Sequence, residues 1–249
     1  MIKEETFYSK KIGWRRKINI YLPSTYNKID KFPVIYAFDG ANLYDPKNSL
    51  SGHSWEIENI IEKLIKEKVT KGFIVVGIYT SKNRLFEYTP VQYKDDVLKY
   101  FKVNHEPLGD TTLDFFDEVK EYIDKNYLTN GINHIMGSSC GGIMSLYALM
   151  KYPHKYSTAG IFSIASTLLK DDYHKMLENA KFSGNKAFVY MGDKESSCLN
   201  GDVIKEAFYI YTILSEKGVD TYLQIGKNKK HNELAWQYAL DLYIRFIEK

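Results

Sequence analysis

The sequence predicts an α/β protein with a mostly parallel central sheet, an antiparallel N-terminal hairpin and helices on both faces. Two N-terminal runs with alternating apolar residues, 6–12 and 15–22, flank Gly13 and indicate the hairpin. Downstream, short apolar runs such as residues 73–78 alternate with segments of helical periodicity. The 249 residues allow one large domain or two small ones, and no Pro-, Ser- or Gly-rich linker divides them. We therefore expect a single domain over residues 1–249.

The individual elements follow from the period of their apolar residues. After the hairpin, whose second strand ends at Pro23, the sequence predicts strands over residues 34–38, 73–78, 134–137, 156–163, 187–191 and 221–225. The predicted helices cover residues 54–66, a segment around 115–123, and residues 142–151, 168–180, 203–217 and 234–248. Ser54 and either Thr111 or Thr112 are the expected N-caps of the first two helices. Residues 89–110 fit neither period, apart from a short amphipathic piece near 97–101, and are expected to form a lid or binding insertion.

Composition narrows the class of protein further. The net charge of +3 is too small to indicate nucleic acid or an anionic membrane as a partner. The N-terminus shows no signal peptide and no apolar run reaches membrane-spanning length, so a cytoplasmic protein with reduced thiols is expected. Cys140 and Cys198 are the only cysteines, which excludes a disulfide framework. Metal-ligand clusters and nucleotide-binding loops are absent from the sequence, so no metal or cofactor is expected.

The segment Gly137-Ser138-Ser139-Cys140-Gly141 matches G-x-S-x-G between a predicted strand and a predicted helix. A nucleophilic serine in this turn sits in strained backbone, and its neighbours must be small. The pattern favours Ser139 as the nucleophile. Cys140 would then contribute its backbone N–H to an oxyanion hole rather than its sulfur.

A serine nucleophile needs a base. In hydrolases whose serine lies in a turn between a strand and a helix, the chain order is serine, acid, histidine. Of the six histidines, His231 is the one that follows a plausible acid. His53 and His105 lie in loops near the mouth of the predicted active site, where either could touch substrate. The remaining three histidines are expected at ordinary core or surface positions. Asp193 and Glu195 both follow the strand over 187–191, and spacing alone does not choose between them.

With these residues assembled, the chain resembles the esterase family of α/β-hydrolases that includes esterase D-like, feruloyl-esterase-like and enterochelin-esterase-like enzymes. The segments that carry the resemblance are Ile20-Tyr21-Leu22-Pro23, Phe38-Asp39-Gly40-Ala41-Asn42-Leu43, the turn from Gly137 to Gly142, and His231-Asn232-Glu233 with Ala235-Trp236. The resemblance implies an α/β-hydrolase fold, with Glu195 rather than Asp193 as the acid. It also implies that the backbone N–H of Ala41 or Asn42 is the second oxyanion donor.

The activity implied is hydrolysis of small carboxylic esters through an acyl-enzyme on Ser139, with His231 as the base. Acylated carbohydrates or aromatic acyl esters are the expected substrates, because 15% of the residues are aromatic and many fall near the predicted mouth. The side chains placed there by position are Tyr44, Trp55, Tyr88, Phe101 and Trp236, each of which could equally belong to the core. The alternatives are a catalytically silent binding protein, or a thioesterase or acyltransferase with the same triad. The sequence does not indicate the oligomeric state.

Overall fold

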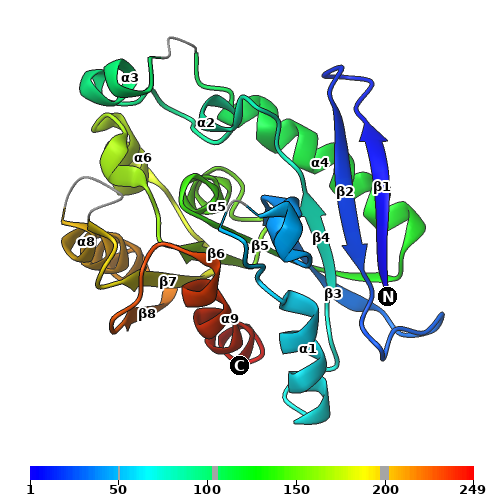
Figure 1. Cartoon of the computed structure of the whole chain (residues 1–249). Helices are drawn as coiled ribbons and strands as arrows, with labels where there is room; N and C mark the ends of the chain where they lie inside the picture. Colours follow the sequence, from blue (N-terminus) through cyan, green and yellow to red (C-terminus); the bar gives the residue numbers. More distant parts are fainter. Residues whose placement is uncertain (50, 103–105, 197–201) are drawn as a thin grey trace.

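The computed structural model describes residues 1–49, 51–102, 106–196 and 202–249, and its described strands form one eight-stranded sheet (Figure 1). The strands are β1 (Ile2–Tyr8), β2 (Arg15–Tyr21), β3 (Phe32–Phe38), β4 (Ile74–Ile78), β5 (Thr129–Ser138), β6 (Thr158–Phe162), β7 (Lys186–Gly192) and β8 (Asp220–Gly226). They lie in the order β1-β2-β4-β3-β5-β6-β7-β8. β2 pairs antiparallel with β1 and β4, and every other pairing is parallel. The predicted mixed sheet with an antiparallel hairpin is confirmed.

Helices cover both faces of the sheet, as predicted. The described helices are α1 (Ile57–Lys66), α2 (Arg84–Glu87), α3 (Asp95–Phe101), α4 (Gly109–Asn126), α5 (Cys140–Lys151), α6 (Asp172–Asn179), α8 (Val203–Glu216) and α9 (Glu233–Ile247), with 3-10 turns η1 (Gly40–Asn42), η2 (Pro46–Asn48) and η3 (Ser166–Leu168). One core layer buries apolar residues of α4, α5 and α8, and the other buries those of α1 and α9. In Figure 1, α1 and α9 lie side by side, consistent with their contact.

The hairpin forms where expected, but its first strand runs from Ile2 to Tyr8 rather than over 6–12. The turn uses the rest of the predicted strand: Ser9 N–H donates to Trp14 O, and Gly13 N–H donates to Ser9 O, both at 2.9 Å. Gly13 has φ 79°, which glycine adopts at little cost.

Both predicted N-caps are wrong, because the predicted capping residues form tertiary hydrogen bonds and the helices begin at other positions. α1 begins at Ile57, and the carbonyl of Ser54 instead accepts a hydrogen bond from the side chain of Gln237 at 2.7 Å. α4 begins at Gly109, before either threonine, and the Thr112 hydroxyl donates to the Glu87 carbonyl at 2.6 Å.

The described part of the irregular segment 89–110 is tied to the region after β6. Tyr93 forms an isolated bridge with Leu169, and Lys94 N–H donates to Leu168 O at 3.0 Å. α3 follows and coincides with the amphipathic piece expected near 97–101. The segment is therefore held against the 3-10 turn η3, which follows β6 in the chain. A lid or binding role for it remains a prediction. Along the described chain, no helix is both long and apolar enough to cross a membrane.

Candidate active site

Ser139 occupies a sharp turn between β5 and α5. Its backbone has φ 59° and ψ −120°, a conformation that L-residues rarely adopt and that marks strain at functional sites. The turn brings Gly137 against Gly141, so that a Cβ on Gly137 would lie 2.7 Å from the Gly141 carbonyl carbon. The strand–Ser–helix pattern and its glycines thus have the geometry that the sequence predicts.

The N-terminus of α5 begins immediately after Ser139. Cys140 is in the first turn, whose N–H groups have no acceptors four residues earlier in the helix and lie at the positive end of its dipole. The Cys140 sulfur is buried and lies 3.7 Å from the Tyr93 hydroxyl. This geometry favours Ser139 over Cys140 as the nucleophile and leaves the Cys140 N–H as a candidate oxyanion donor.

His231 is paired with Glu195, which emerges just beyond β7. Glu195 Oε2 lies 2.8 Å from His231 Nδ1. Glu195 is fully buried, and its Oε1 accepts hydrogen bonds from Gly192 N–H at 2.7 Å and from the Ser163 hydroxyl at 2.8 Å. A carboxylate only accepts, so the proton of a neutral His231 lies on Nδ1 and its Nε2 can act as a base.

Asp193, the alternative acid, is oriented differently. Its backbone N–H donates to Gly226 O at 3.0 Å, whereas its Oδ1 is buried with no hydrogen-bond partner among the described residues. The geometry therefore favours Glu195, the acid that the family resemblance implies, over Asp193.

Trp236 and Ser163 form a chain of hydrogen bonds to Glu195, and no local sequence pattern marks Ser163. Trp236 Nε1 donates to Ser163 Oγ at 2.8 Å, and Ser163 donates in turn to Glu195. The Trp236 ring meets His231 edge-on at 5.3 Å and stacks on Trp55 at 5.5 Å. The positive φ of Ser163 (48°), at the end of a strand, is visible only in the structure.

The second candidate oxyanion donor lies in the turn after β3. Asp39 has φ 56°, and its carbonyl accepts the N–H of Asn42 at 2.9 Å. Because this bond uses the Asn42 N–H, the turn favours Ala41 as the donor. Gly40 packs closely against β4: a Cβ on Gly40 would lie 2.5 Å from the Gly77 carbonyl carbon.

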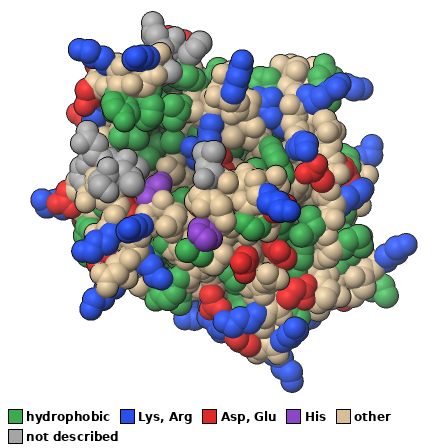
Figure 2. All heavy atoms as spheres, in the orientation of Figure 1, with side chains coloured by type: hydrophobic (Ala, Val, Ile, Leu, Met, Phe, Trp, Pro, Cys, Tyr) green, Lys and Arg blue, Asp and Glu red, His purple; other side chains and the backbone are tan. Residues whose placement is uncertain are grey.

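The five aromatic residues predicted near the mouth occupy different environments. Trp55, Tyr88 and Trp236 are buried, and Tyr44 is partly buried and packs against the α1–α9 core layer. Phe101 is 43% exposed on α3, and Figure 2 shows hydrophobic side chains gathered at the surface near α3 and α6. Substrate contact by any of the five stays a prediction. Of the two loop histidines, His53 is exposed and His105 lies outside the described residues.

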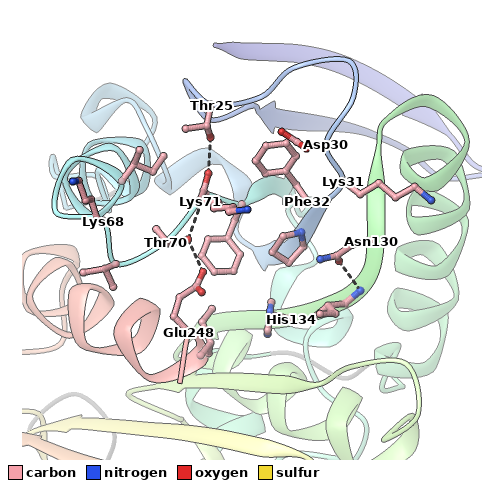
Figure 3. A pocket seen from close by; sticks show the side chains of 17 residues that line it. Thr25, Asp30, Lys31, Phe32, Lys68, Thr70, Lys71, Asn130, His134 and Glu248 are labelled. Carbon is pink, nitrogen blue, oxygen red and sulfur yellow. Dashed lines mark hydrogen bonds between the residues drawn. The ribbon is translucent and has the colours of Figure 1, made fainter.

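A large cavity, drawn in Figure 3, lies near the amino ends of strands β3 and β5, at the other edge of the sheet. It has a volume of about 890 Å³ and is lined by Phe32 and Asn130, near the amino ends of β3 and β5, and by His134. In an open parallel sheet, reactive groups gather at the carboxyl ends of the strands. Ser139, Glu195 and His231 follow that rule, and this cavity does not.

The sheet order, the turn at Ser139 and the helices on both faces define an α/β-hydrolase fold. The chain belongs to an esterase family: a family model described as "Putative esterase" matches residues 9–240. It is similar to the uncharacterized protein YbbA of Bacillus subtilis, with 24% identity over 248 residues covering 90% of this chain and 93% of the relative.

Solved structures share the fold. An IroE-like serine hydrolase from Shewanella oneidensis has a TM-score of 0.79 at 19% identity, covering 99% of this chain and 80% of the other. The enterobactin esterase FES from Shigella flexneri has a TM-score of 0.72 at 13% identity, covering 99% of this chain and 59% of the other. Family and neighbours together support ester hydrolysis as the activity.

Proposed function

We propose that the protein is a serine hydrolase that cleaves small carboxylic esters through an acyl-enzyme on Ser139. The observation that carries the proposal is the 2.8 Å contact between His231 and the buried Glu195, at the same sheet edge as the strained Ser139. Ser139, Glu195 and His231 also follow one another in the chain order typical of α/β-hydrolases.

In the proposed reaction the Ser139 hydroxyl attacks the ester carbonyl while His231 Nε2 takes its proton. The N–H groups of Cys140 and Ala41 stabilise the oxyanion, and Glu195 stabilises the imidazolium. His231 then protonates the departing alcohol. Water, activated by the same histidine, releases the acid and restores Ser139.

The proposed substrates are small esters with aromatic acyl groups or carbohydrate alcohols. Exposed Tyr100 and Phe101 on α3 offer stacking surfaces, and α3 belongs to the segment that is held against η3, the 3-10 turn after β6. Two of the neighbours are, by name, a ferulic acid esterase from Anaeromyces mucronatus and an enterobactin esterase. Both names indicate esters.

A covalent probe tests the nucleophile. We expect a fluorophosphonate to label the wild-type protein on Ser139, as read by mass spectrometry of the digested protein. Ser139→Ala should lose the label and the esterase activity, whereas the matched variant Ser138→Ala at the neighbouring serine should keep the label. Equal labelling of Ser139→Ala would contradict the proposal, and no labelling of the wild type would favour a catalytically silent binding protein.

A substrate panel then separates the chemical classes. Nitrophenyl acetate and butyrate, feruloyl methyl ester, acetylated sugars and acyl thioesters would be compared by kcat/KM. We expect turnover of oxygen esters, with feruloyl or sugar esters ahead of nitrophenyl butyrate. Turnover of thioesters alone would instead indicate a thioesterase.

A further inference from the structure

A partly buried ion pair lies beside the turn that carries the second proposed oxyanion donor. Arg84, at the start of α2, donates from Nε and Nη2 to the two carboxylate oxygens of Asp39, each at 2.7 Å. The Asp39 side chain is 8% exposed and that of Arg84 is 31% exposed. Such a bidentate fork fixes the orientation of the carboxylate as well as its charge.

Every polar group of Asp39 is occupied. Its N–H donates to the Tyr88 hydroxyl at 3.1 Å, its carbonyl accepts from Asn42, and its carboxylate is held by Arg84. Asp39 also has the positive φ that starts the turn, two residues before Ala41. The ion pair therefore anchors the residue whose backbone conformation directs the Ala41 N–H.

The same carboxylate also lies close to the other half of the proposed oxyanion hole. A Cβ built on Gly141 would lie 3.4 Å from Asp39 Oδ2, which places the carboxylate beside the first turn of α5, next to Cys140. An unpaired negative charge there would oppose the negative oxygen that develops in acyl transfer, and burial would strengthen that repulsion. Arg84 supplies the compensating positive charge.

We infer that Arg84 is a positioning residue for acyl transfer: it neutralises Asp39 beside the oxyanion hole and fixes the turn that presents Ala41. This inference rests on the proposed function. Arg84 need not touch the reacting atoms, since it acts through Asp39.

The electrostatics of the pair agree with this role. Burial alone would lower the pKa of Arg84, but the charge and hydrogen bonds of Asp39 outweigh it and hold that pKa well above its ordinary value. The Arg84 guanidinium also lies over the Tyr88 ring, 5.1 Å from its centroid. Arg84 therefore stays charged throughout the pH range in which His231 could act as a base.

The test measures kcat and KM on nitrophenyl acetate for single and double variants. We expect Arg84→Gln to lower kcat about 100-fold, comparable to losing one oxyanion donor, with KM changed less than about threefold. Adding Asp39→Asn to Arg84→Gln removes the unpaired charge and keeps the shape of the side chain at position 39. The double variant should therefore be at least about tenfold faster than Arg84→Gln. A loss of kcat caused only by misplacement of the turn would persist in the double variant, which also lacks the bidentate contact.

Two controls separate a specific effect of Arg84 from a general effect of losing an arginine or of misfolding. Arg15→Gln, on the exposed face of β2, should leave kcat unchanged, and thermal unfolding reports whether each variant is folded. If Arg84→Gln does not fold, Arg84→Lys replaces it: retained charge predicts a kcat within about tenfold of wild type, and a loss of 100-fold or more overturns the inference. A fully active Arg84→Gln, or a double variant no faster than it, would also overturn it. Fluorophosphonate labelling of wild-type Ser139 is independent of these outcomes, so failure of this inference and failure of the proposed function are distinguishable.

Discussion

Glu195 is a buried carboxylate that accepts from a backbone N–H, a hydroxyl and an imidazole. A carboxylate with this set of donors is held in a single orientation and keeps the proton of His231 on Nδ1. Its amide counterpart would present an NH₂ group to one of these donors, and the tautomer of His231 would no longer be fixed.

We therefore expect Glu195→Gln to lower kcat at least about 100-fold, with KM little changed. Asp193→Asn is the matched control two residues away, and should lower kcat less than about threefold. Steady-state kinetics on nitrophenyl acetate measure both. The reverse order of effects would make Asp193 the orienting acid.

The sequence predicts Ser139 and His231 from local patterns, because strand, glycines and chain order all restrict the choice. It cannot choose between Asp193 and Glu195 from spacing, since the choice depends on which side chain points toward His231. Nor does it find Ser163 or Arg84. Their roles come from hydrogen bonds to residues 32 and 45 positions away in the chain, and no local pattern encodes such contacts.

Among the elements, α9 connects the two halves of the candidate site. Glu233, in its first turn and two residues after His231, accepts hydrogen bonds from the hydroxyls of Ser49 and Ser51 and from the Asn42 side chain. Gln237, one turn later, donates to Ser54 O. The helix thus holds both the loop of His231 and the segment that follows the turn at Ala41.

We expect Glu233→Ala to lower kcat about tenfold, because Ser49, Ser51 and Asn42 lose their common acceptor and the turn at Ala41 becomes mobile. Glu233→Gln, which keeps one acceptor oxygen, should recover part of the loss. Leu234→Ala, at the exposed neighbouring position, is the control and should behave as wild type. Equal kcat values in all three variants would show that the hydrogen bonds accepted by Glu233 are dispensable.

Element types were predictable from periodicity, and element ends were not. The strand over residues 134–137 extends in the structure from Thr129 to Ser138, because its polar first half pairs with β3 near Phe32. α2 spans four residues, too few for a periodic pattern, yet it carries both Arg84 and the buried Glu87. Short elements of this kind depend on tertiary contacts for their stability.

At the scale of the whole molecule, the sheet places the candidate catalytic residues at one edge and a buried histidine toward the other. His134, in β5, is 4% exposed, and its Nδ1 has no partner among the described residues. Burial, with a smaller contribution from Lys186, lowers the pKa of His134 to about 4. The folded protein therefore keeps this imidazole neutral.

This shift predicts a pH dependence of the unfolding free energy. The unfolded chain protonates His134 below about pH 6.5 and the folded chain only below about pH 4, so stability falls as the pH drops through that window. Between pH 7.5 and 4.5 we expect wild type to lose about 2 kcal/mol more than His134→Gln, which has no titrating group there. Urea unfolding at the two pH values measures the difference. Equal losses in the two proteins would contradict the pKa shift.

The ring contact between His231 and Trp236 has an optical consequence. An imidazolium quenches a neighbouring indole more strongly than a neutral imidazole does, and these two rings lie 5.3 Å apart. The fluorescence of Trp236 should therefore follow the charge on His231. Trp14 directly precedes β2, toward the other end of the strand order from β8, and its fluorescence should not respond. The side chain that braces the acid is also an intrinsic reporter of the proton that the chemistry would move.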